Sequence, residues 1–460
     1  MKNYRILLGA TFILLSILTA CEKEDQGMDD PGSSHDEMTS SYDNTMIIRW
    51  DNAISIAIDN KIPTAPESRV YAIVTLAMHD ALNNVFPKYE TYALSNSARS
   101  KTIWSNDQFA EIADAAVARA AHDALIEVAP QWKTQADSLL DLYHSEMGYD
   151  GSTGVTELAK SGFEIGREAA SAILTLRKND IHAGFYAYDQ GDSPGEYRST
   201  LPFSRPNPPV WPENAAYAPE WGKNVPFGLE SADKFRPEFP EEGILAPFYA
   251  NDYKEVYRLG CHDCPDRTKE QTEMGVFFIE NSPGAINRIA RTLAVNENLN
   301  GFETGRLLAL SHMVQADAHI SAFEAKFTYN LWRPITGINM GDTDGNDLTV
   351  GDKNWTIPAL PGMRPTPPVP AFPSSHAANG GAAAELFKLF FRTDEIVFYT
   401  QSLTLPNVTR TYNSFSQYAQ DISDSRIYVG YQFRTSVEAG EMMGRQIADN
   451  IYKNKLRLMP

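Results

Sequence analysis

The stretch Ala110-Glu-Ile-Ala-Asp-Ala-Ala-Val-Ala-Arg-Ala-Ala121 repeats small apolar residues at the spacing of an α-helix, and this pattern recurs along most of the 460-residue chain. Residues three and four positions apart share one helix face, and alanine lets neighbouring helices approach closely. The same periodicity predicts helices at Met46–Asp59, Val70–Val85, Phe109–Val128, Glu157–Leu176, Gln271–Leu293 and Phe302–Phe327. Because alternating strand patterns are scarce, the sequence predicts an all-α protein made of packed helical bundles.

Helical periodicity stops between residues 183 and 243, where proline and aromatic residues dominate, as in Pro206-Asn-Pro-Pro-Val-Trp-Pro212. A loop of this length inside a compact domain is either functional or an irregular arm packed over a bundle. A second such stretch, Trp355–Pro373, precedes a helix expected at Ala377–Phe391. We therefore expect one domain over residues 45–460, with N-terminal helices at 46–182, an irregular arm at 183–243 and C-terminal helices that carry the site at 244–455.

The N-terminus is expected to lie outside that domain. Lys2 and Arg5 precede an apolar run at 6–18, which is too short to span a bilayer comfortably and ends in Leu18-Thr19-Ala20-Cys21. This order predicts a signal peptide at residues 1–20 and resembles a bacterial lipoprotein signal in which Cys21 is lipidated. An ordinary secretory signal with an incidental cysteine is the alternative. We expect an exported protein, anchored by its lipid to the bacterial membrane, on the periplasmic side or at the cell surface.

Acidic residues outnumber basic ones, and the formal net charge is −19. Residues 21–44 carry part of this excess and few apolar side chains, so they cannot bury enough surface to offset the entropy of ordering, which predicts a flexible tether. A negative surface disfavours nucleic acid and anionic lipid as partners. We therefore expect a small-molecule substrate, no nucleic acid, and contact with the membrane only through the N-terminal lipid.

Two cysteines remain after Cys21, in Cys261-His-Asp-Cys264. In an oxidising compartment this spacing predicts a local disulfide between Cys261 and Cys264 that pins a loop. The alternative is a zinc site, which needs a second pair of ligands at matched spacing, and the sequence shows none.

Three segments in the C-terminal part gather groups that suit a tetrahedral oxyanion: Lys326-Phe-Thr-Tyr-Asn-Leu-Trp-Arg333-Pro334, Pro373-Ser-Ser-His376 and Ser425-Arg426-Ile-Tyr-Val-Gly-Tyr-Gln432. Lys326 and Arg333 are expected on one face at the end of a helix that Pro334 breaks. The lysine offers a point charge and the arginine a planar fork for two oxygens. Arg426 is expected to begin a further helix, which runs to Ile451, and to supply a second guanidinium.

Ser374, Ser375 and His376 lie where the proline-rich stretch gives way to the helix at Ala377–Phe391. A helix N-terminus presents unpaired backbone amides and the positive end of a dipole, so it attracts anions. Ser374 is expected to donate its hydroxyl and Ser375 its amide, and His376 is placed as a general acid or base. The alternative is that Ser374 only caps the helix.

In this order, the three segments resemble the signature of the vanadium-dependent haloperoxidase and type 2 phosphatidic acid phosphatase (acid phosphatase) superfamily. The segments Ala77-Met-His-Asp-Ala-Leu-Asn83, Arg267-Thr-Lys-Glu-Gln-Thr272 and Asn330-Leu-Trp-Arg-Pro-Ile-Thr336 also look like bacterial members. The resemblance implies an all-α haloperoxidase-like fold that holds vanadate, or alternatively phosphate, between helices. By motif position, it implies an oxyanion bound by Lys326, Arg333, Ser374, Arg426 and the amide of Ser375, with His376 as the acid/base residue.

Two residues depart from the family pattern. Ser375 stands where the family has glycine, but its amide is kept, and serine is tolerated there if its φ is negative. Gln432 stands where a histidine is expected, the residue that binds vanadium in haloperoxidases and accepts phosphate in phosphatases. A carboxamide can hydrogen-bond to an oxyanion, but it is a weak metal ligand and a poor nucleophile.

Three hypotheses follow for the function. The first is a haloperoxidase-like enzyme that holds vanadate and oxidises a halide or another small nucleophile with peroxide. The second is a phosphomonoesterase, for which Gln432 closes the phosphohistidine route and leaves direct attack by water. The third is a lipoprotein that binds oxyanions or a protein partner without catalysis, because Gln432 replaces the expected histidine.

Overall fold

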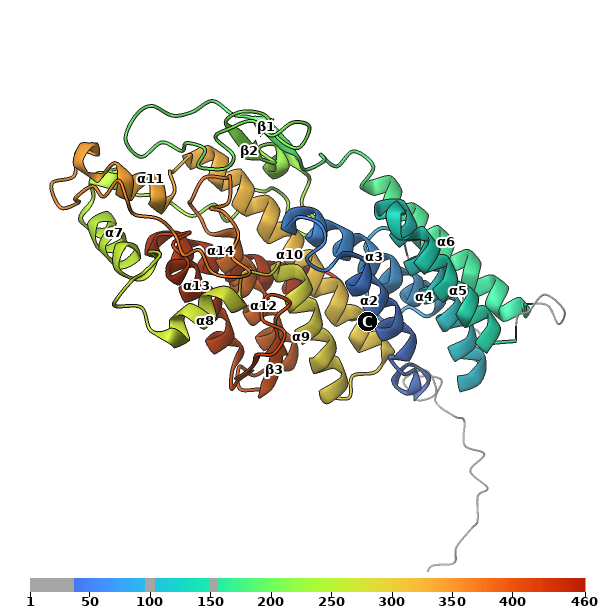
Figure 1. Cartoon of the computed structure of the whole chain (residues 1–460). Helices are drawn as coiled ribbons and strands as arrows, with labels where there is room; N and C mark the ends of the chain where they lie inside the picture. The colour runs from blue at the N-terminus through green and yellow to red at the C-terminus, as the bar shows by residue number, and fades with distance from the viewer. Residues whose placement is uncertain (1–36, 96–103, 149–154, 460) are drawn as a thin grey trace, which may run out of the picture.

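The computed structural model describes residues 37–95, 104–148 and 155–459, and α-helices dominate them (Figure 1). The helices are α2 (Thr45–Ile58), α3 (Thr64–Val85), α4 (Asn106–Val128), α5 (Lys133–Glu146), α6 (Glu157–Leu176), α7 (Pro247–Leu259), α8 (Lys269–Phe277), α9 (Ser282–Asn296), α10 (Gly301–Tyr329), α11 (Pro334–Asn339), α12 (Ser375–Phe391), α13 (Phe415–Tyr428) and α14 (Arg434–Asn454). Two short antiparallel pairs accompany them, β1 (Phe185–Ala187) with β2 (Ala215–Tyr217) and β3 (Phe398–Gln401) with β4 (Thr409–Tyr412). The predicted all-α fold is confirmed.

The long helix α10 lies at the centre and connects two groups of helices. It contacts α3, which packs with α4 and α6, and it contacts α12, which packs with α13 and α14. In Figure 1, α4 to α6 lie at one end of the molecule, and α7, α8 and α11 lie at the other. Side chains on all sides of α10 are buried, including Leu307, Met313 and Val314, as expected of a core helix.

Helices α12 and α14 approach each other backbone to backbone, because glycine leaves no side chain between them. A Cβ atom on Gly444 would lie 1.9 Å from the carbonyl oxygen of Ala378, and one on Gly440 would lie 2.3 Å from that of Ser374. The amide of Ser374, the N-cap residue of α12, also donates to the carbonyl oxygen of Ser436 at 2.8 Å. The first turn of α12 is therefore held firmly against α14.

The prediction of one helix at Gln271–Leu293 is wrong, because the chain forms α8 and α9 there. Helix α8 ends at Phe277, and α9 begins at Ser282 with Pro283 in its first turn. Proline has no amide hydrogen and fits the start of a helix better than its interior. The apolar periodicity continues across the break, so periodicity alone did not reveal it.

The prediction of one helix from Ser425 to Ile451 is also wrong. Ser425 and Arg426 lie in the last turn of α13, rather than at the start of a helix. Gly430 follows with a φ of +73°, which ends the helical path before α14 begins. The chain therefore turns sharply between Arg426 and Gln432.

The prediction that Lys326 and Arg333 share one helix face is wrong as well. Helix α10 ends at Tyr329, and Asn330 takes a left-handed conformation with a φ of +51°. Arg333 lies beyond this turn, directly before α11, of which Pro334 is the first residue. Pro334 thus begins a helix here instead of ending one.

The arm at residues 183–243 packs over the bundle with little regular structure of its own. Strands β1 and β2 pair within it, and the amide of Tyr217 donates to the carbonyl oxygen of Pro368 at 2.8 Å. Asp317 of α10 anchors the arm further along. Its carboxylate accepts hydrogen bonds of 2.5, 2.7 and 2.9 Å from three successive backbone amides, those of residues 227 to 229.

The predicted tether ends too late, because its last residues pack against the domain. Met38 and Tyr42 are buried. The Tyr42 hydroxyl donates to Asp114 Oδ1 at 2.8 Å, and its ring meets two phenylalanine rings edge-on. Because both side chains are buried against helices of the bundle, this short segment is part of the domain.

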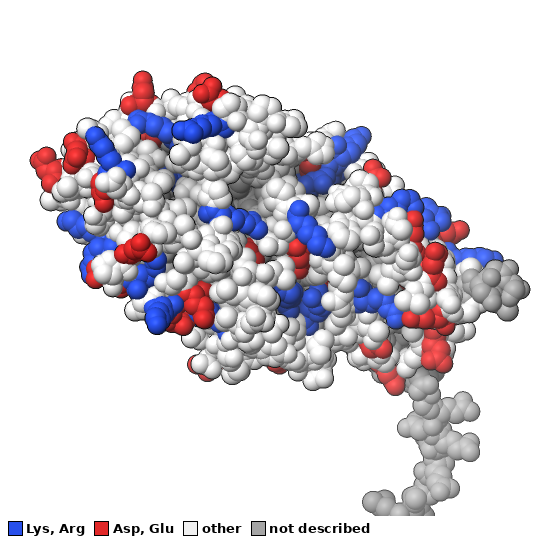
Figure 2. All heavy atoms as spheres, viewed as in Figure 1, with Lys and Arg blue, Asp and Glu red and all other residues white. Residues whose placement is uncertain are grey.

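The face shown in Figure 2 carries both basic and acidic side chains, separated by wide uncharged areas. None of the helices that the structure describes is long and apolar enough to cross a membrane. The predicted signal peptide and Cys21 fall within residues 1–36, outside the described part of the chain.

Candidate functional site

Six of the residues predicted to form a site line one cavity of about 350 Å³: Arg333, Ser374, Ser375, His376, Arg426 and Gln432. They come from the segment before α11, the first turn of α12, the end of α13 and the turn before α14. Segments far apart in the sequence therefore meet. Lys326, the seventh predicted residue, is not among those that line the cavity.

The first turn of α12 presents hydrogen-bond donors at this cavity. Ser374 caps the helix, because its Oγ accepts from the amide of Ala377 at 3.3 Å, and its hydroxyl hydrogen can still be donated elsewhere. Among the described residues, the amides of Ser375 and His376 have no hydrogen-bond acceptor. Ser375 is the first helical residue and its φ is not positive, so serine in place of glycine causes no strain. This helix terminus suits an anion.

Two guanidinium groups reach the cavity wall with donors to spare. Arg333 donates from Nε to the carbonyl oxygen of Val369 at 2.7 Å and from Nη1 to that of Tyr431 at 2.9 Å. Arg426 donates from Nη2 to the carbonyl oxygen of Phe278 at 2.7 Å and from Nε to the preceding serine at 3.0 Å. Nη2 of Arg333 and Nη1 of Arg426 have no acceptor in the described chain. Burial lowers the pKa of both arginines to about 10, so both stay charged at neutral pH.

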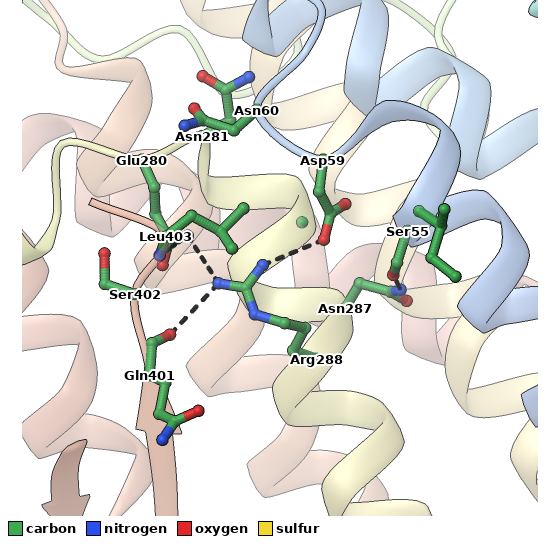
Figure 3. A network of polar contacts seen from close by, with 12 residues as sticks. Ser55, Asp59, Asn60, Glu280, Asn281, Asn287, Arg288, Gln401, Ser402 and Leu403 are labelled. Carbon is green, nitrogen blue, oxygen red and sulfur yellow. Dashed lines mark hydrogen bonds and ion pairs between the residues drawn. The ribbon is translucent and has the colours of Figure 1, made fainter. Parts of the chain in front are cut away.

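Neither of these buried cations has a carboxylate partner among the residues described. Glu280 also lines the cavity, but its Oε2 pairs with Arg288 Nη2 at 2.6 Å. Arg288 in turn pairs with Asp59 Oδ2 at 3.1 Å, so it lies between two carboxylates (Figure 3). Glu280 is therefore balanced by Arg288 and does not neutralise Arg333 or Arg426. Because an unpaired buried charge is costly, the cavity favours an anion.

Lys326 lies behind the cavity wall rather than on it. Its Nζ donates to the carbonyl oxygens of Pro370 and Ala371 at 2.9 and 3.0 Å, and the residue is fully buried. Burial lowers its pKa well below the usual range, and Arg333 lowers it further. The contacts of Lys326 hold the extended segment that leads into Ser374.

Gln432 uses both of its polar atoms within the protein. In the orientation that gives each a partner, Nε2 donates to the carbonyl oxygen of Ala371 at 2.8 Å and Oε1 accepts from Arg333 Nη1 at 2.8 Å. The carbonyl of Ala371 also accepts from Lys326. The position where the sequence placed a doubtful metal ligand therefore carries a side chain that fixes Arg333.

His376 lines the cavity and is partly exposed to it. Burial lowers the pKa of His376 well below the usual range, and Arg426 and His319 lower it further, whereas the carbonyl group of Phe278 acts in the opposite direction. The imidazole is thus neutral at neutral pH, and a neutral imidazole can accept a proton.

A disulfide joins Cys261 and Cys264. Arg267 donates from Nη1 to the carbonyl oxygens of Cys261 and Tyr428 at 2.6 and 3.3 Å, so the disulfide loop lies against the end of α13. Gly430 packs on the same loop: a Cβ atom there would lie 2.4 Å from the carbonyl oxygen of the glycine at 260. The loop thus supports the turn that leads into Gln432.

Comparison with known proteins agrees with this fold. A family model described as the VCPO second helical-bundle domain matches residues 306–459. The vanadium chloroperoxidase of Curvularia inaequalis is 24% identical over 376 residues, covering 70% of this chain and 61% of that protein, so the chain spans less than two thirds of its length.

Two bacterial structures are similar over nearly the whole chain. The first bacterial vanadium-dependent iodoperoxidase matches with a TM-score of 0.68 at 21% identity, covering 95% of this chain and all of that one. A holo-type bacterial vanadium-dependent chloroperoxidase matches with a TM-score of 0.67 at 17% identity, covering 90% and 97%. The C-terminal third of the chain thus matches a vanadium chloroperoxidase domain, and the described fold is similar to that of vanadium-dependent haloperoxidases.

Two basic residues on the wall of this cavity were missed by sequence reasoning. Arg364 lies at the exposed rim and donates to Asn281 Oδ1 at 3.1 Å. It belongs to the stretch Trp355–Pro373, whose position directly before the Ser-Ser-His motif was the available signal. His319 lines the cavity from α10, and no motif flanks it.

The remaining wall is largely apolar and was also not predicted residue by residue. The arm contributes Phe185, Phe203 and Tyr217, and α10 contributes Phe323. The three aromatic rings of the arm belong to one cluster, with Phe185 stacked on Phe203 at 5.5 Å and edge-on to Tyr217 at 5.2 Å between ring centroids. The arm therefore forms part of the cavity as well as covering the bundle.

Proposed function

We propose that the chain is an exported oxidoreductase of haloperoxidase type, which binds vanadate in this cavity and uses peroxide to oxidise a halide or another small nucleophile. One observation carries the proposal. Two buried guanidinium groups and the N-terminus of α12 meet in one cavity with spare donors, and no carboxylate in the described part of the chain pairs with these guanidinium groups. This donor set fits a tetrahedral oxyanion, which accepts several hydrogen bonds at once.

Each residue has a role in that proposal. Arg333 donates from Nη2, Arg426 from Nη1 and Ser375 from its amide, while Ser374 donates its hydroxyl. When bound, vanadate supplies the electrophilic centre at which peroxide becomes an oxidant. His376 is neutral, so it takes a proton from peroxide at its free ring nitrogen and returns it to the departing oxygen. Lys326 and Gln432 hold the surrounding backbone and Arg333 in position.

Phosphomonoester hydrolysis is the second candidate, since phosphate suits the same donors. Gln432 has no basic nitrogen with which to attack phosphorus, and its amide is already engaged with Arg333 and Ala371. Hydrolysis would then depend on direct attack by water, activated by His376. A lipoprotein that binds oxyanions or a protein partner without catalysis is the third candidate.

Calorimetric titration of the full chain with orthovanadate tests the proposal first. We expect binding that Arg333→Ala abolishes, whereas Arg445→Ala, which removes an arginine paired with Glu441 on α14, leaves it intact. The loaded protein should then oxidise iodide or bromide with peroxide, and His376→Ala should lose this activity. Turnover of an aryl phosphate in its place would favour the phosphatase, and anion binding without either activity would favour the third candidate.

The proposal includes export and a lipid on Cys21, a residue outside the described part of the chain. The order of charged residues, apolar run and cysteine at the N-terminus supports it. When the protein is expressed in a bacterium that processes lipoproteins, we expect it in the membrane fraction. Cys21→Ser should move it to the soluble fraction, and an unchanged distribution would argue against the lipid anchor.

A further inference from the structure

His319 is, with His376, one of two histidines that line the cavity among the residues described. It lies on α10, seven residues before Lys326, which is about two helical turns, and only 2% of its surface is exposed. Its side chain therefore reaches the same cavity from a different element than His376, on α12, and Gln432, in the turn before α14, do.

One contact of His319 favours the tautomer in which Nδ1 carries the proton. Nδ1 lies 3.1 Å from the carbonyl oxygen of Gln315, one turn earlier on α10. A carbonyl oxygen only accepts, so the tautomer that makes this contact has its hydrogen on Nδ1 and its lone pair on Nε2. Histidines that bind metals typically have this arrangement, in which a backbone carbonyl fixes one nitrogen and leaves the other as the ligand. Burial lowers the pKa of His319 to about 4, so the lone pair is available at neutral pH.

The surroundings of His319 are polar and incompletely paired. Asn379 Nδ2 lies 3.2 Å from Nε2, and it is closer to Nδ1, at 2.9 Å, and to Ser282 Oγ, also at 2.9 Å. Oδ1 of Asn379 and Oε1 of Gln315 are both buried without a partner in the described structure. Buried polar atoms normally have partners, and a ligand at Nε2 has only the 3.2 Å contact to displace.

Gln432 cannot supply a basic nitrogen lone pair, whereas His319 can. Its amide nitrogen has no basic lone pair, and its two polar atoms bind Ala371 and Arg333. A cavity without an imidazole at position 432 thus has an imidazole at position 319 on its wall.

We propose that His319 Nε2 donates its lone pair to vanadium when vanadate occupies this cavity, and so supplies the nitrogen ligand that Gln432 does not. This inference rests on the proposed function, because it requires an oxyanion in the cavity. No proton leaves Nε2 in this step, since the hydrogen is on Nδ1. Vanadium(V) accepts a further ligand in this way, whereas phosphorus in inorganic phosphate does not.

The affinities for orthovanadate and phosphate together therefore show whether His319 is a ligand or only shapes the cavity. We expect His319→Gln to weaken orthovanadate binding by about 100-fold, the upper range for losing a supporting partner at a metal site. The same variant should change the affinity for inorganic phosphate by no more than about threefold, less than the factor of ten that corresponds to 1.4 kcal/mol. His319→Phe, which keeps the ring and loses both nitrogens, should behave alike. Calorimetry of the full chain measures both affinities.

His312→Gln is the matched control, because His312 is also buried on α10 and is not among the residues that line the cavity. It should leave both affinities within about twofold. In the parent labelled with ¹⁵N-histidine, orthovanadate should shift the Nε2 resonance of His319, and phosphate should not. This second measurement needs no variant that must fold.

The outcomes distinguish a failure of His319 as a ligand from a failure of the oxyanion site. If the parent binds both anions and His319→Gln lowers both affinities equally, or neither, His319 is a core histidine and this inference is wrong, while the oxyanion site stands. A loss of vanadate affinity in His312→Gln as large as that in His319→Gln would overturn it too. If the parent binds neither anion, the proposed function itself fails.

Discussion

Gln432 Oε1 accepts a hydrogen bond of 2.8 Å from Arg333 Nη1, and Gln432 Nε2 donates one of 2.8 Å to the carbonyl oxygen of Ala371. Lys326 donates to that same carbonyl oxygen at 3.0 Å. One neutral side chain therefore lies between two buried basic residues, bonded directly to the arginine and through a carbonyl to the lysine. It fixes Arg333 without neutralising it, so the charge of the arginine remains available to an anion.

Replacing Gln432 by glutamate should disable the site without changing its shape. The Gln432→Glu side chain has the same size, but its charge would pair with Arg333 and compete with any bound anion. We expect the dissociation constants for orthovanadate and phosphate to rise by about tenfold or more, which is about 1.4 kcal/mol. Titration calorimetry measures both constants. Gln420→Glu, which adds the same charge at an exposed position on α13, should leave them unchanged.

Ser374 combines the two roles that the sequence left as alternatives, and two variants separate them. Ser374→Ala removes the N-cap of α12, which we expect to lower the free energy of unfolding by about 1 kcal/mol and also to weaken oxyanion binding. Ser374→Asp keeps a capping oxygen but adds a negative charge beside Arg333 and Arg426. It should retain more stability than Ser374→Ala and lose orthovanadate binding entirely.

Denaturant unfolding and calorimetry on the two Ser374 variants give these quantities. If Ser374→Asp bound orthovanadate as tightly as the parent does, the hydroxyl would act only as a cap and Ser374 would take no part in binding the anion.

Apolar periodicity predicted the helices well where the periodic stretch coincides with one continuous helix. The prediction for α6, Glu157–Leu176, matches its bounds in the structure. Periodicity failed at Pro283 and Gly430, where apolar residues continue at helical spacing across a break. It also placed Arg333 on α10, because Asn330 does not show in sequence that it will adopt a left-handed conformation.

The candidate site was predictable to the extent that its residues lie in motifs. Their order and chemistry brought six of them to one cavity. His319 and Arg364 were missed, because what places them on the wall is the packing of α10 and of a proline-rich loop. The engagement of Lys326 with two carbonyl groups is likewise a tertiary feature, which a run of residue types does not reveal.

Gly444 should be a position where alanine destabilises a helix. Alanine normally stabilises a helix interior relative to glycine by roughly 0.5–1 kcal/mol. At Gly444 the added Cβ would lie 1.9 Å from the carbonyl oxygen of Ala378, so α12 and α14 must separate. We expect Gly444→Ala to lower the free energy of unfolding by about 1–3 kcal/mol, the usual cost of overpacking.

The matched control for Gly444 is Gly305→Ala on α10. A Cβ atom there would meet only side-chain carbons of Ile47 and Leu82, at 3.4 and 3.9 Å. This variant should be neutral or stabilising in the same denaturant titration. Equal effects at Gly305 and Gly444 would contradict the close approach of α12 and α14.

His312 should make stability depend on pH through a proton that the folded protein cannot accept. Its Nε2 lies 2.7 Å from Asn287 Oδ1, its ring stacks on Tyr71 at 4.2 Å between centroids, and Nδ1 has no partner among the described residues. Burial lowers the pKa of His312 to about 3, and Arg291 lowers it further. A second proton would sit on Nδ1 without an acceptor.

The sign of the His312 effect follows from linkage. Because the folded pKa is below that of the unfolded chain, about 6.5, the unfolded state binds more protons and stability is lost as pH falls from 6.5 towards 3. Between pH 8 and pH 5 we expect the parent to lose about 2 kcal/mol relative to His312→Gln. Denaturant titrations of both proteins give the difference, in which the other titrating groups cancel. Parallel curves for the two proteins would mean that His312 is protonated in the folded state.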